Sequence, residues 1–388
     1  MLDKLKRTDW SIVVLMVLFM VISTLVVHSA TANDPLFLGT DVRNMINFAV
    51  GFVVMFAAML FDYRILIKGG WYLYALGIIL LVAVYLFGAE KNSAKSWFLL
   101  PFGFNFQPAE LVKLLTIIAI AAFLAKRDGE PLRFWREVVP IGLMVALPVA
   151  LIVIQPDLGN AIIFLVVLVV LYWIGNIKYT HVLIGGALIG GFIALFFYLF
   201  QIYYDPVIQY LKENDRGEWV HRVNRIHTYI DPDAASADAK YQVHNSMRAI
   251  GSGGLTGETY MNGDSIQKGF IPLPYSDSIF VVIGEEFGFV GSSVLLLLYF
   301  LLIYRMIYIS IQSQNRTGAY IIIGIVSMYV FQIFENIGMM IGIMPLTGIT
   351  LPFVSYGGSS LMINMMAVGI VLSIHVHQEQ KSLYGTSG

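Results

Sequence analysis

The chain has 388 residues and a formal net charge of -1, and 58% of its residues are hydrophobic while only 13% are charged. Soluble domains carry roughly a quarter charged residues, so this composition, with a mean hydropathy of +0.75, indicates an integral membrane protein. The absence of cysteine excludes disulfides and thiolate metal sites, and a nearly neutral chain without a basic tail is not expected to bind nucleic acid.

Apolar runs long enough to cross about 30 Å of hydrocarbon recur ten times along the chain. The first run follows three basic residues, but its apolar core is longer than that of an ordinary signal peptide, so it is predicted to remain as the first span. The sequence therefore predicts an all-α polytopic membrane protein of about ten transmembrane helices, in a single membrane domain over residues 1–388. The ten runs cover residues 11–27, 46–61, 71–87, 111–125, 138–154, 161–174, 182–200, 279–302, 319–337 and 361–374.

Lysine and arginine in the short loops predict how the chain crosses the membrane, because basic residues near span ends resist translocation. With the N-terminus inside, the inner segments hold 13 of these residues and the short outer loops hold 3. Both termini are therefore expected in the cytoplasm, and a large loop, residues 201–276, is expected outside between helices 7 and 8. The irregular segments 88–107, 155–159 and 338–358 face outside as well, so function is expected on the outer face.

The large outer loop offers cations for a phosphate-bearing ligand. Arg222 and Arg225 lie at i and i+3, on one face if the segment is helical, and two planar guanidinium forks side by side suit a pyrophosphate. A solvated charged face explains the same pair equally well. A helix is predicted from the N-cap Asp231 to just before Gly251, with Arg248 on its polar side. This helix either lies along the interface or covers the bundle.

Charged residues within the predicted spans are few, and two of them lie one turn apart. Glu110 precedes Lys113 in the first turns of the fourth span, which is the favourable order for an ion pair near the N-terminal end of a helix. Charges inside a membrane are either paired or functional. A structural ion pair is the preferred interpretation here, ahead of a catalytic pair.

The most informative acid is Asp277, which stands where a polar loop ends and the eighth apolar run begins. A carboxylate at the boundary of water and lipid is where a membrane enzyme would place a general base. On an ideal helix with 100° per residue, Gly284 and Gly288 both fall within about 20° of Asp277. This glycine stripe predicts either close helix packing or a groove in which a lipid chain lies while its head group reaches the carboxylate.

Six segments together resemble the successive motifs of one family, in order and over nearly the whole chain. That family is SEDS, the shape, elongation, division and sporulation proteins. The short N-terminal KRTDW and the DYR at 62–64 resemble the elongation branch of the family more than the division branch. The six segments are FNFQPAELVKL (104–114), QPDLG (155–159), HRVNRIHTYIDP (221–232), YQVHNSMRAIGSGGLTG (241–257), SDSIFVVIGEEFGF (276–289) and MPLTGITLPFVSYGGSS (344–360).

The resemblance implies a peptidoglycan glycosyltransferase that polymerises lipid II into glycan strands during cell elongation and maintenance of cell shape. It also implies a multi-pass protein of the bacterial cytoplasmic membrane whose active face is extracellular or periplasmic. The expected partner is a class B penicillin-binding protein, the transpeptidase that crosslinks the product.

Carried over residue by residue, the resemblance assigns the essential carboxylate of the family to Asp277 and its functional loop tryptophan to Trp97. It assigns the buried acid and lysine to Glu110 and Lys113. The family commonly reads HTDF at the acid, whereas this chain reads YSDS at 275–278. The acid is retained and its neighbours differ, so its tuning by those neighbours differs as well.

The implied reaction needs a base, because a sugar hydroxyl that attacks an anomeric carbon is a poor nucleophile. Asp277 is the expected base, and Arg222, Arg225 and Arg248 are expected to bind the departing pyrophosphate. A divalent cation, Mg²⁺ or Mn²⁺, held by carboxylates is the alternative source of positive charge, and no other cofactor is expected. One direct displacement inverts the anomeric carbon. Trp97 either stacks on a sugar face or anchors the chain at the interface.

Two other functions fit part of the pattern. A lipid II translocase would also be polytopic, but it should show access from both leaflets and often an internal repeat. In this chain the irregular and polar segments gather on one side, which favours an outer-leaflet enzyme. A non-catalytic scaffold of the wall-synthesis complex is the third interpretation, and it leaves Asp277 above its glycines unexplained.

Overall fold

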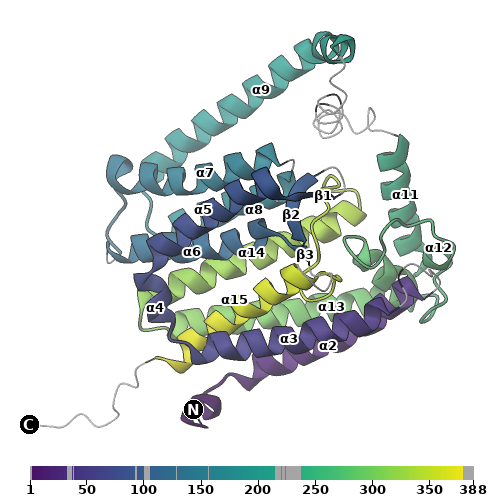
Figure 1. The fold of residues 1–388 in the computed structure, drawn as a ribbon, viewed down its shortest axis with the longest axis horizontal. Coiled ribbons are helices and arrows are strands. Elements are labelled where there is room, and N and C mark those ends of the chain that lie inside the picture. Colours follow the sequence, from purple (N-terminus) through teal and green to yellow (C-terminus); the bar gives the residue numbers. More distant parts are fainter. Residues whose placement is uncertain are drawn as a thin grey trace, which may run out of the picture.

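The computed structural model confirms the predicted fold class, a helical membrane bundle (Figure 1). It describes residues 2–32, 37, 39–91, 94–99, 105–127, 129–155, 157–214, 220, 223 and 237–378. Each of the ten predicted spans coincides with a helix in this part of the chain. Within the described residues, eight helical segments are long and apolar enough to cross a membrane, and Leu158–Ile174 is a shorter apolar helix.

The helices are given with their bounds in chain order. They are α1 (Leu2–Lys6), α2 (Trp10–Thr31), α3 (Thr40–Leu60), α4 (Tyr63–Lys68), α5 (Gly70–Phe87), α6 (Pro108–Ala125), a π-helical turn (Phe134–Val138) that continues into α7 (Val139–Ile154), α8 (Leu158–Ile174), α9 (Tyr179–Glu213), α11 (Ala237–Ser252), α12 (Asp264–Gln267), α13 (Ile279–Gln312), α14 (Arg316–Met340) and α15 (Gly358–Val376).

Two chain ends meet at one end of the bundle, and the functional loops lie at the other. Figure 1 shows α4 and the end of α15 at one end, with α11, α12 and the small sheet toward the opposite end. The Lys4 Nζ lies 2.7 Å from the His377 Nε2 and donates to the Leu60 carbonyl, which joins the first and last helices. The two termini therefore share one side, as the distribution of basic residues predicts.

Close helix packing explains why the bundle centre holds small residues. A Cβ on Gly324 of α14 would lie 2.5 Å from the Ile117 Cγ2 of α6, and a Cβ on Gly369 of α15 would meet the Met55 carbonyl of α3. Between helices in a membrane, small residues allow backbones to approach and gain dispersion contacts. Helices α6, α14 and α15 consequently form the centre of the bundle, with most of their side chains buried.

A small antiparallel sheet forms where the sequence predicts irregular backbone, in the segment 88–107. Its strands are β1 (Ala89–Lys91), β2 (Ala94–Leu99) and β3 (Asn105–Phe106), in the order β1-β2-β3. The Ser96 hydroxyl of β2 donates to the Gln155 carbonyl at the end of α7, 3.3 Å away. The strands are too short for a clear periodic pattern, and pairing with each other and with α7 decides their conformation.

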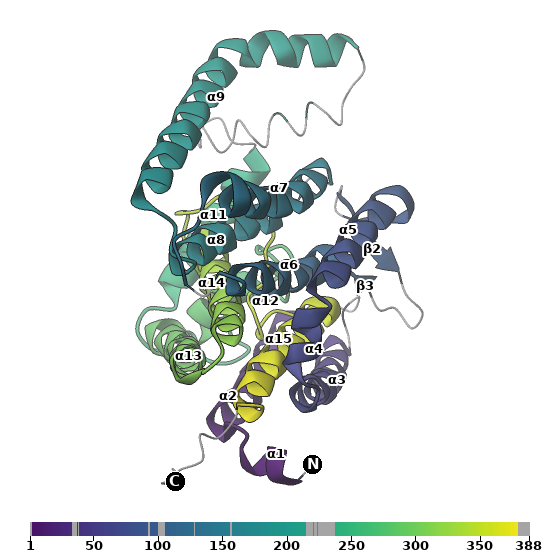
Figure 2. The same ribbon diagram turned by 90° about the vertical axis from the view of Figure 1, so that its left-hand side faces the viewer.

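Several predicted boundaries are wrong, and two of the differences concern the outer segment. Helix α9 continues past residue 200 to Glu213, so the first part of the outer segment is helical, and α13 continues to Gln312. Gly251 lies within α11, which ends at Ser252, whereas Asp231 is outside the described residues. Figures 1 and 2 show α9 splayed away from the other helices.

Candidate active site

Asp277 lies at the end of the bundle opposite α4, two residues before α13 begins at Ile279. Its side chain is partly buried, and this burial raises the pKa of the Asp277 carboxyl above its ordinary value, although backbone N–H groups partly offset the shift. The Asp277 Oδ1 is buried and has no hydrogen-bond partner among the described residues. A partly desolvated carboxylate with an unused oxygen is suited to accept a proton.

The outer loop between α14 and α15, residues 341–357, packs directly against the Asp277 segment. The Tyr356 N–H donates to the Tyr275 carbonyl at 2.9 Å, and the two tyrosine rings meet with centroids 5.9 Å apart. Gly348 has φ +75°, and a Cβ at this position would lie 3.9 Å from the Asp277 Oδ2. A glycine backbone in this loop therefore forms one wall beside the carboxylate.

The predicted ion pair between Glu110 and Lys113 is confirmed, and it belongs to a larger buried network. The Lys113 Nζ lies 2.9 Å from the Glu110 Oε1 and 2.8 Å from the Asn160 Oδ1. The Asn160 amide and the Gln107 amide each donate to the Asp157 carboxylate at 2.8 Å. Burial raises the pKa of the Asp157 carboxyl at the N-cap of α8, against the hydrogen bonds from Asn160.

Sequence reasoning did not connect Asp157 and Asn160 to the pair on α6. Asn160 lies 47 residues from Lys113 in the chain, so no local spacing relates the two. The one available signal is the tight turn before α8, because such turns place an N-cap acid at the start of a helix.

The same network approaches the outer loop through α14. The Thr347 hydroxyl donates to the Glu335 Oε1 at 2.9 Å. A Cβ on Gly159 would lie 2.6 Å from the Ile349 Cγ1 and 2.9 Å from the Thr347 Cβ, so the loop rests on the first turn of α8. The buried charges and the Asp277 segment are thus joined by one loop.

The lipid groove predicted below Asp277 is wrong, because the Gly284 and Gly288 side of α13 is already filled. A Cβ on Gly284 would lie 2.9 Å from the Ile250 Cγ1 of α11, and a Cβ on Gly288 would lie 2.5 Å from the Gly257 N. The Phe289 N–H donates to the Gly254 carbonyl at 2.9 Å. The loop that follows α11 occupies this face.

The helical wheel failed at this point for a local reason. Gly288 has φ +62° and ψ −155°, so α13 is kinked there and is not an ideal helix. The glycines serve close packing with the loop, which was the alternative interpretation. Glu285 serves the same contact, since its carboxylate accepts from the Ser265 and Ile266 N–H groups. The Glu286 carboxylate instead accepts from the Ser29 hydroxyl of α2.

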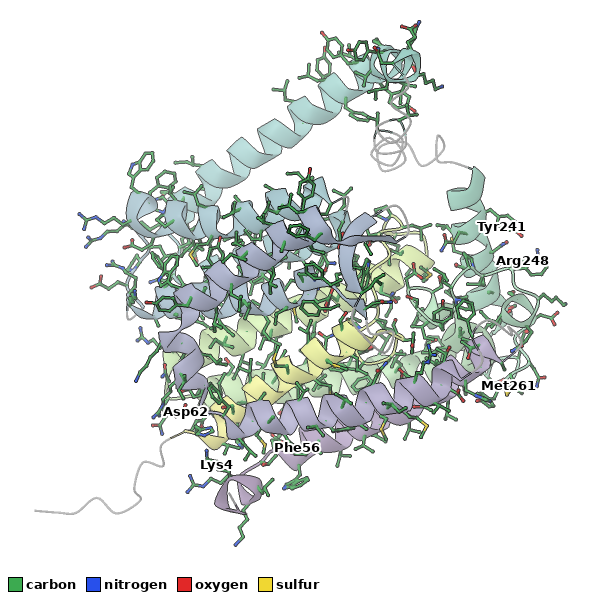
Figure 3. The ribbon with its side chains drawn as sticks, viewed as in Figure 1. Lys4, Phe56, Asp62, Tyr241, Arg248 and Met261 are labelled. Carbon is green, nitrogen blue, oxygen red and sulfur yellow. The ribbon has the colours of Figure 1, made fainter. Side chains whose placement is uncertain are left out.

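Of the remaining predicted binding residues, Trp97 and Arg248 lie in the part of the chain that the structure describes. Trp97 is half-buried on β2, where it pairs with Ala89. Arg248 is exposed on α11, and Figure 3 shows Arg248 and Tyr241 directed away from the bundle. Arg222 and Arg225 lie outside the described residues.

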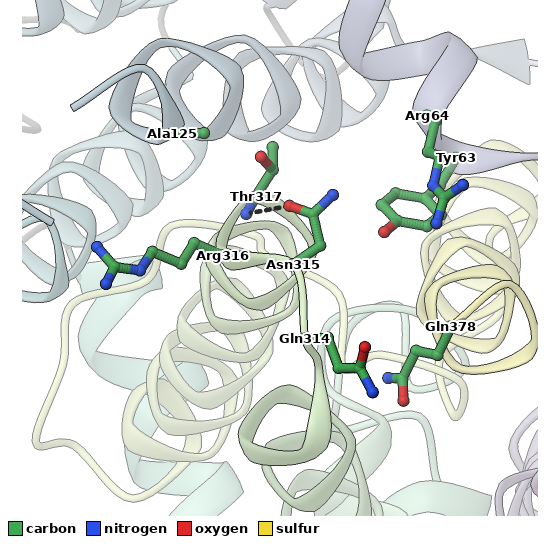
Figure 4. Close-up of a pocket in the computed structure, with 8 residues that line it drawn as sticks. All are labelled: Tyr63, Arg64, Ala125, Gln314, Asn315, Arg316, Thr317 and Gln378. Carbon is green, nitrogen blue, oxygen red and sulfur yellow. Dashed lines mark hydrogen bonds between the residues drawn. The ribbon is translucent and has the colours of Figure 1, made fainter. Parts of the chain in front are cut away.

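A cavity of about 440 Å³ lies at the opposite, terminal end of the bundle. Ala125 and Arg316 in its wall are the last residue of α6 and the first residue of α14, whereas the Asp277 site involves the opposite ends of these helices. Figure 4 shows its polar lining, in which the Asn315 Oδ1 accepts from the Thr317 N–H. This cavity is therefore distinct from the candidate active site.

Comparisons with known proteins define the class first. The model of a family described as "Cell cycle protein", comprising FtsW, RodA and SpoVE, matches residues 4–380. The chain is 33% identical over 387 residues to "Peptidoglycan glycosyltransferase MrdB" of Escherichia coli (strain K12), covering 97% of this chain and 98% of that protein. It is 31% identical over 385 residues to "Stage V sporulation protein E" of Bacillus subtilis (strain 168), covering 96% and 98% of the two chains.

Solved structures agree with the sequence comparisons. A chain from "Structural coordination of polymerization and crosslinking by a peptidoglycan synthase complex" superimposes with a TM-score of 0.76 at 28% identity, covering 96% of this chain and 99% of that one. RodA, the rod shape determining protein of Thermus thermophilus, superimposes with a TM-score of 0.67 at 28% identity, covering 96% and 98%. The chain belongs to the FtsW, RodA and SpoVE family, the SEDS proteins that its motifs resemble.

Proposed function

We propose that this chain is the peptidoglycan glycosyltransferase of cell elongation, polymerising lipid II into glycan strands, with Asp277 as its general base. Membership of the family and 33% identity to a peptidoglycan glycosyltransferase support the activity. The observation that carries the role of Asp277 is its partly buried carboxylate beside the outer loop, with a raised pKa and an unused Oδ1.

In the proposed reaction Asp277 accepts the proton of a sugar hydroxyl as that oxygen attacks the anomeric carbon of the donor. The new glycosidic C–O bond forms while the bond from the anomeric carbon to the lipid pyrophosphate breaks, and the pyrophosphate leaves with the electron pair. Attack opposite the leaving group inverts the anomeric carbon. Burial of the carboxylate brings its pKa nearer to neutral pH, where a general base is most effective.

The leaving pyrophosphate needs positive charge, for which we propose Arg222 and Arg225 of the outer segment, because Arg248 is exposed and directed away from the bundle. Among the described residues no group of three or more acids or histidines is placed to hold a metal. Mg²⁺ is often held by only one or two carboxylates together with substrate phosphates. A divalent cation of that kind would use the Asp277 Oδ1 as ligand, and loss of polymerisation on chelation with EDTA, restored by Mg²⁺ or Mn²⁺, would support it.

We also propose on which face of the membrane the reaction takes place and which protein is the partner. The chain is a multi-pass membrane protein, and the position of Asp277 at the end opposite the two termini supports an active face outside the cytoplasmic membrane. A structural neighbour comes from a complex of polymerisation and crosslinking. This supports a class B penicillin-binding protein as the partner of this chain, with Trp97 at the rim contacting glycan.

The decisive experiment measures glycan polymer formed by the purified protein from labelled lipid II in detergent, with and without the partner. Detergent has no leaflets, so polymer formation identifies an enzyme, whereas a translocase or a scaffold would yield none. Asp277→Asn should reduce the rate at least about a hundredfold, while Asp264→Asn, a change at an exposed outer acid, should not. Wild-type polymer yield from folded Asp277→Asn would remove Asp277 from the base role.

A further inference from the structure

Asn336 joins the residue that carries the carboxylate to the loop that covers it. It lies near the end of α14 and is fully buried. Its Nδ2 donates to the Asp277 carbonyl and to the Ile349 carbonyl, each at 2.7 Å. A side-chain amide has two N–H hydrogens, so this one group satisfies both carbonyls and has no donor left over.

One carbonyl belongs to Asp277 itself and the other to the loop beside it. Ile349 follows Gly348, whose backbone lies beside the Asp277 Oδ2. A further hydrogen bond between the two segments runs from the Tyr356 N–H to the Tyr275 carbonyl, at the far end of the loop. Without Asn336 the hydrogen bonds that join the Asp277 segment to the loop beside its carboxylate would be lost, and the Asp277 and Ile349 carbonyls would each lose a donor.

We propose that Asn336 is a positioning residue for glycosyl transfer, which sets the place of the Asp277 carboxylate relative to the outer loop. The inference rests on the proposed role of Asp277 as the base. A general base must be within hydrogen-bond reach of the hydroxyl that it deprotonates, and a displacement of about 1 Å in a reacting group costs on the order of a hundredfold in rate. Asn336 itself touches neither substrate nor the carboxylate oxygens.

The test compares Asn336→Leu with a matched control, Asn364→Leu. Asn364 is another buried asparagine, on α15, whose amide donates to the Ser360 hydroxyl at 3.3 Å rather than to the segment that carries Asp277. Turnover of labelled lipid II is measured per folded molecule. Asn336→Leu should lower kcat by about ten- to a hundredfold while KM for lipid II stays within about twofold, because lipid II binding is left intact. Asn364→Leu should leave both constants unchanged.

Two further variants keep the test decisive. Should Asn336→Leu not fold, Asn336→Ser takes its place, since one hydroxyl donor can satisfy at most one of the two carbonyls, and the same loss of kcat is expected. Asn336→Gln retains the amide and should recover part of the rate. Wild-type kcat in folded Asn336→Leu or Asn336→Ser, or an equal loss in Asn364→Leu, would overturn the proposal. If Asp277→Asn is inactive while the Asn336 variants are fully active, the positioning role of Asn336 is refuted and the role of Asp277 as the base still stands.

Discussion

Removing Lys113 alone should destabilise the protein far more than removing it together with the charge of its partner. Lys113 is 2% exposed and donates both to Glu110, at 2.9 Å, and to Asn160, at 2.8 Å. Lys113→Met leaves a buried carboxylate without its cation, which costs about 3–5 kcal/mol. Adding Glu110→Gln removes the stranded charge, so most of that loss should return.

The recovery should be incomplete for a reason visible in the network. In the double variant the Asn160 Oδ1 still lacks its donor, and one unsatisfied buried polar group costs about 1–3 kcal/mol. Thermal melting in detergent measures the cycle of wild type, two single variants and double variant. Lys126→Met serves as the control, because this exposed lysine caps the other end of α6. Strictly additive losses from Glu110→Gln and Lys113→Met would refute the coupling.

Three further predictions concern the outer site. Because burial raises the pKa of the Asp277 carboxyl above 3.8, polymerisation should fall in acid with a midpoint above pH 3.8. The protonated carboxyl stabilises the fold fully only below pH 3.8, and this stabilisation is lost as the pH rises through the raised pKa. Asp277→Asn should therefore melt higher than wild type at pH 7 and equally at pH 3, and a lower melting temperature of the variant at pH 7 would contradict this. Gly284→Val should lower the free energy of unfolding by about 1–3 kcal/mol, because the larger side chain overpacks against Ile250. An unchanged melting temperature would mean that this face of α13 is open, as a lipid groove requires. Gly348→Leu should lower turnover per folded molecule by at least about tenfold, because its side chain extends beyond a Cβ that already contacts the Asp277 Oδ2 at 3.9 Å. Gly269→Leu, with a similar φ of +72° and open space around it, should not.

Local patterns in the sequence were sufficient for the helices and for one of the polar contacts. The apolar runs predict the ten helices because a membrane span needs a continuous apolar stretch whatever it packs against. Glu110 and Lys113 lie one turn apart, so their ion pair follows from helix geometry alone. The position of Asp277 at the mouth of α13 is likewise local.

The surroundings of those residues were decided only by the tertiary structure. A periodic pattern assumes a regular helix and says nothing about the partner on its glycine face, so it could not show that α13 kinks at Gly288 or that the loop after α11 fills the groove. Asn160 reaches Lys113 across 47 residues and Asn336 reaches Asp277 across 59. Such contacts depend on which helices pack together, and the spacing of residues in a single sequence does not reveal that packing.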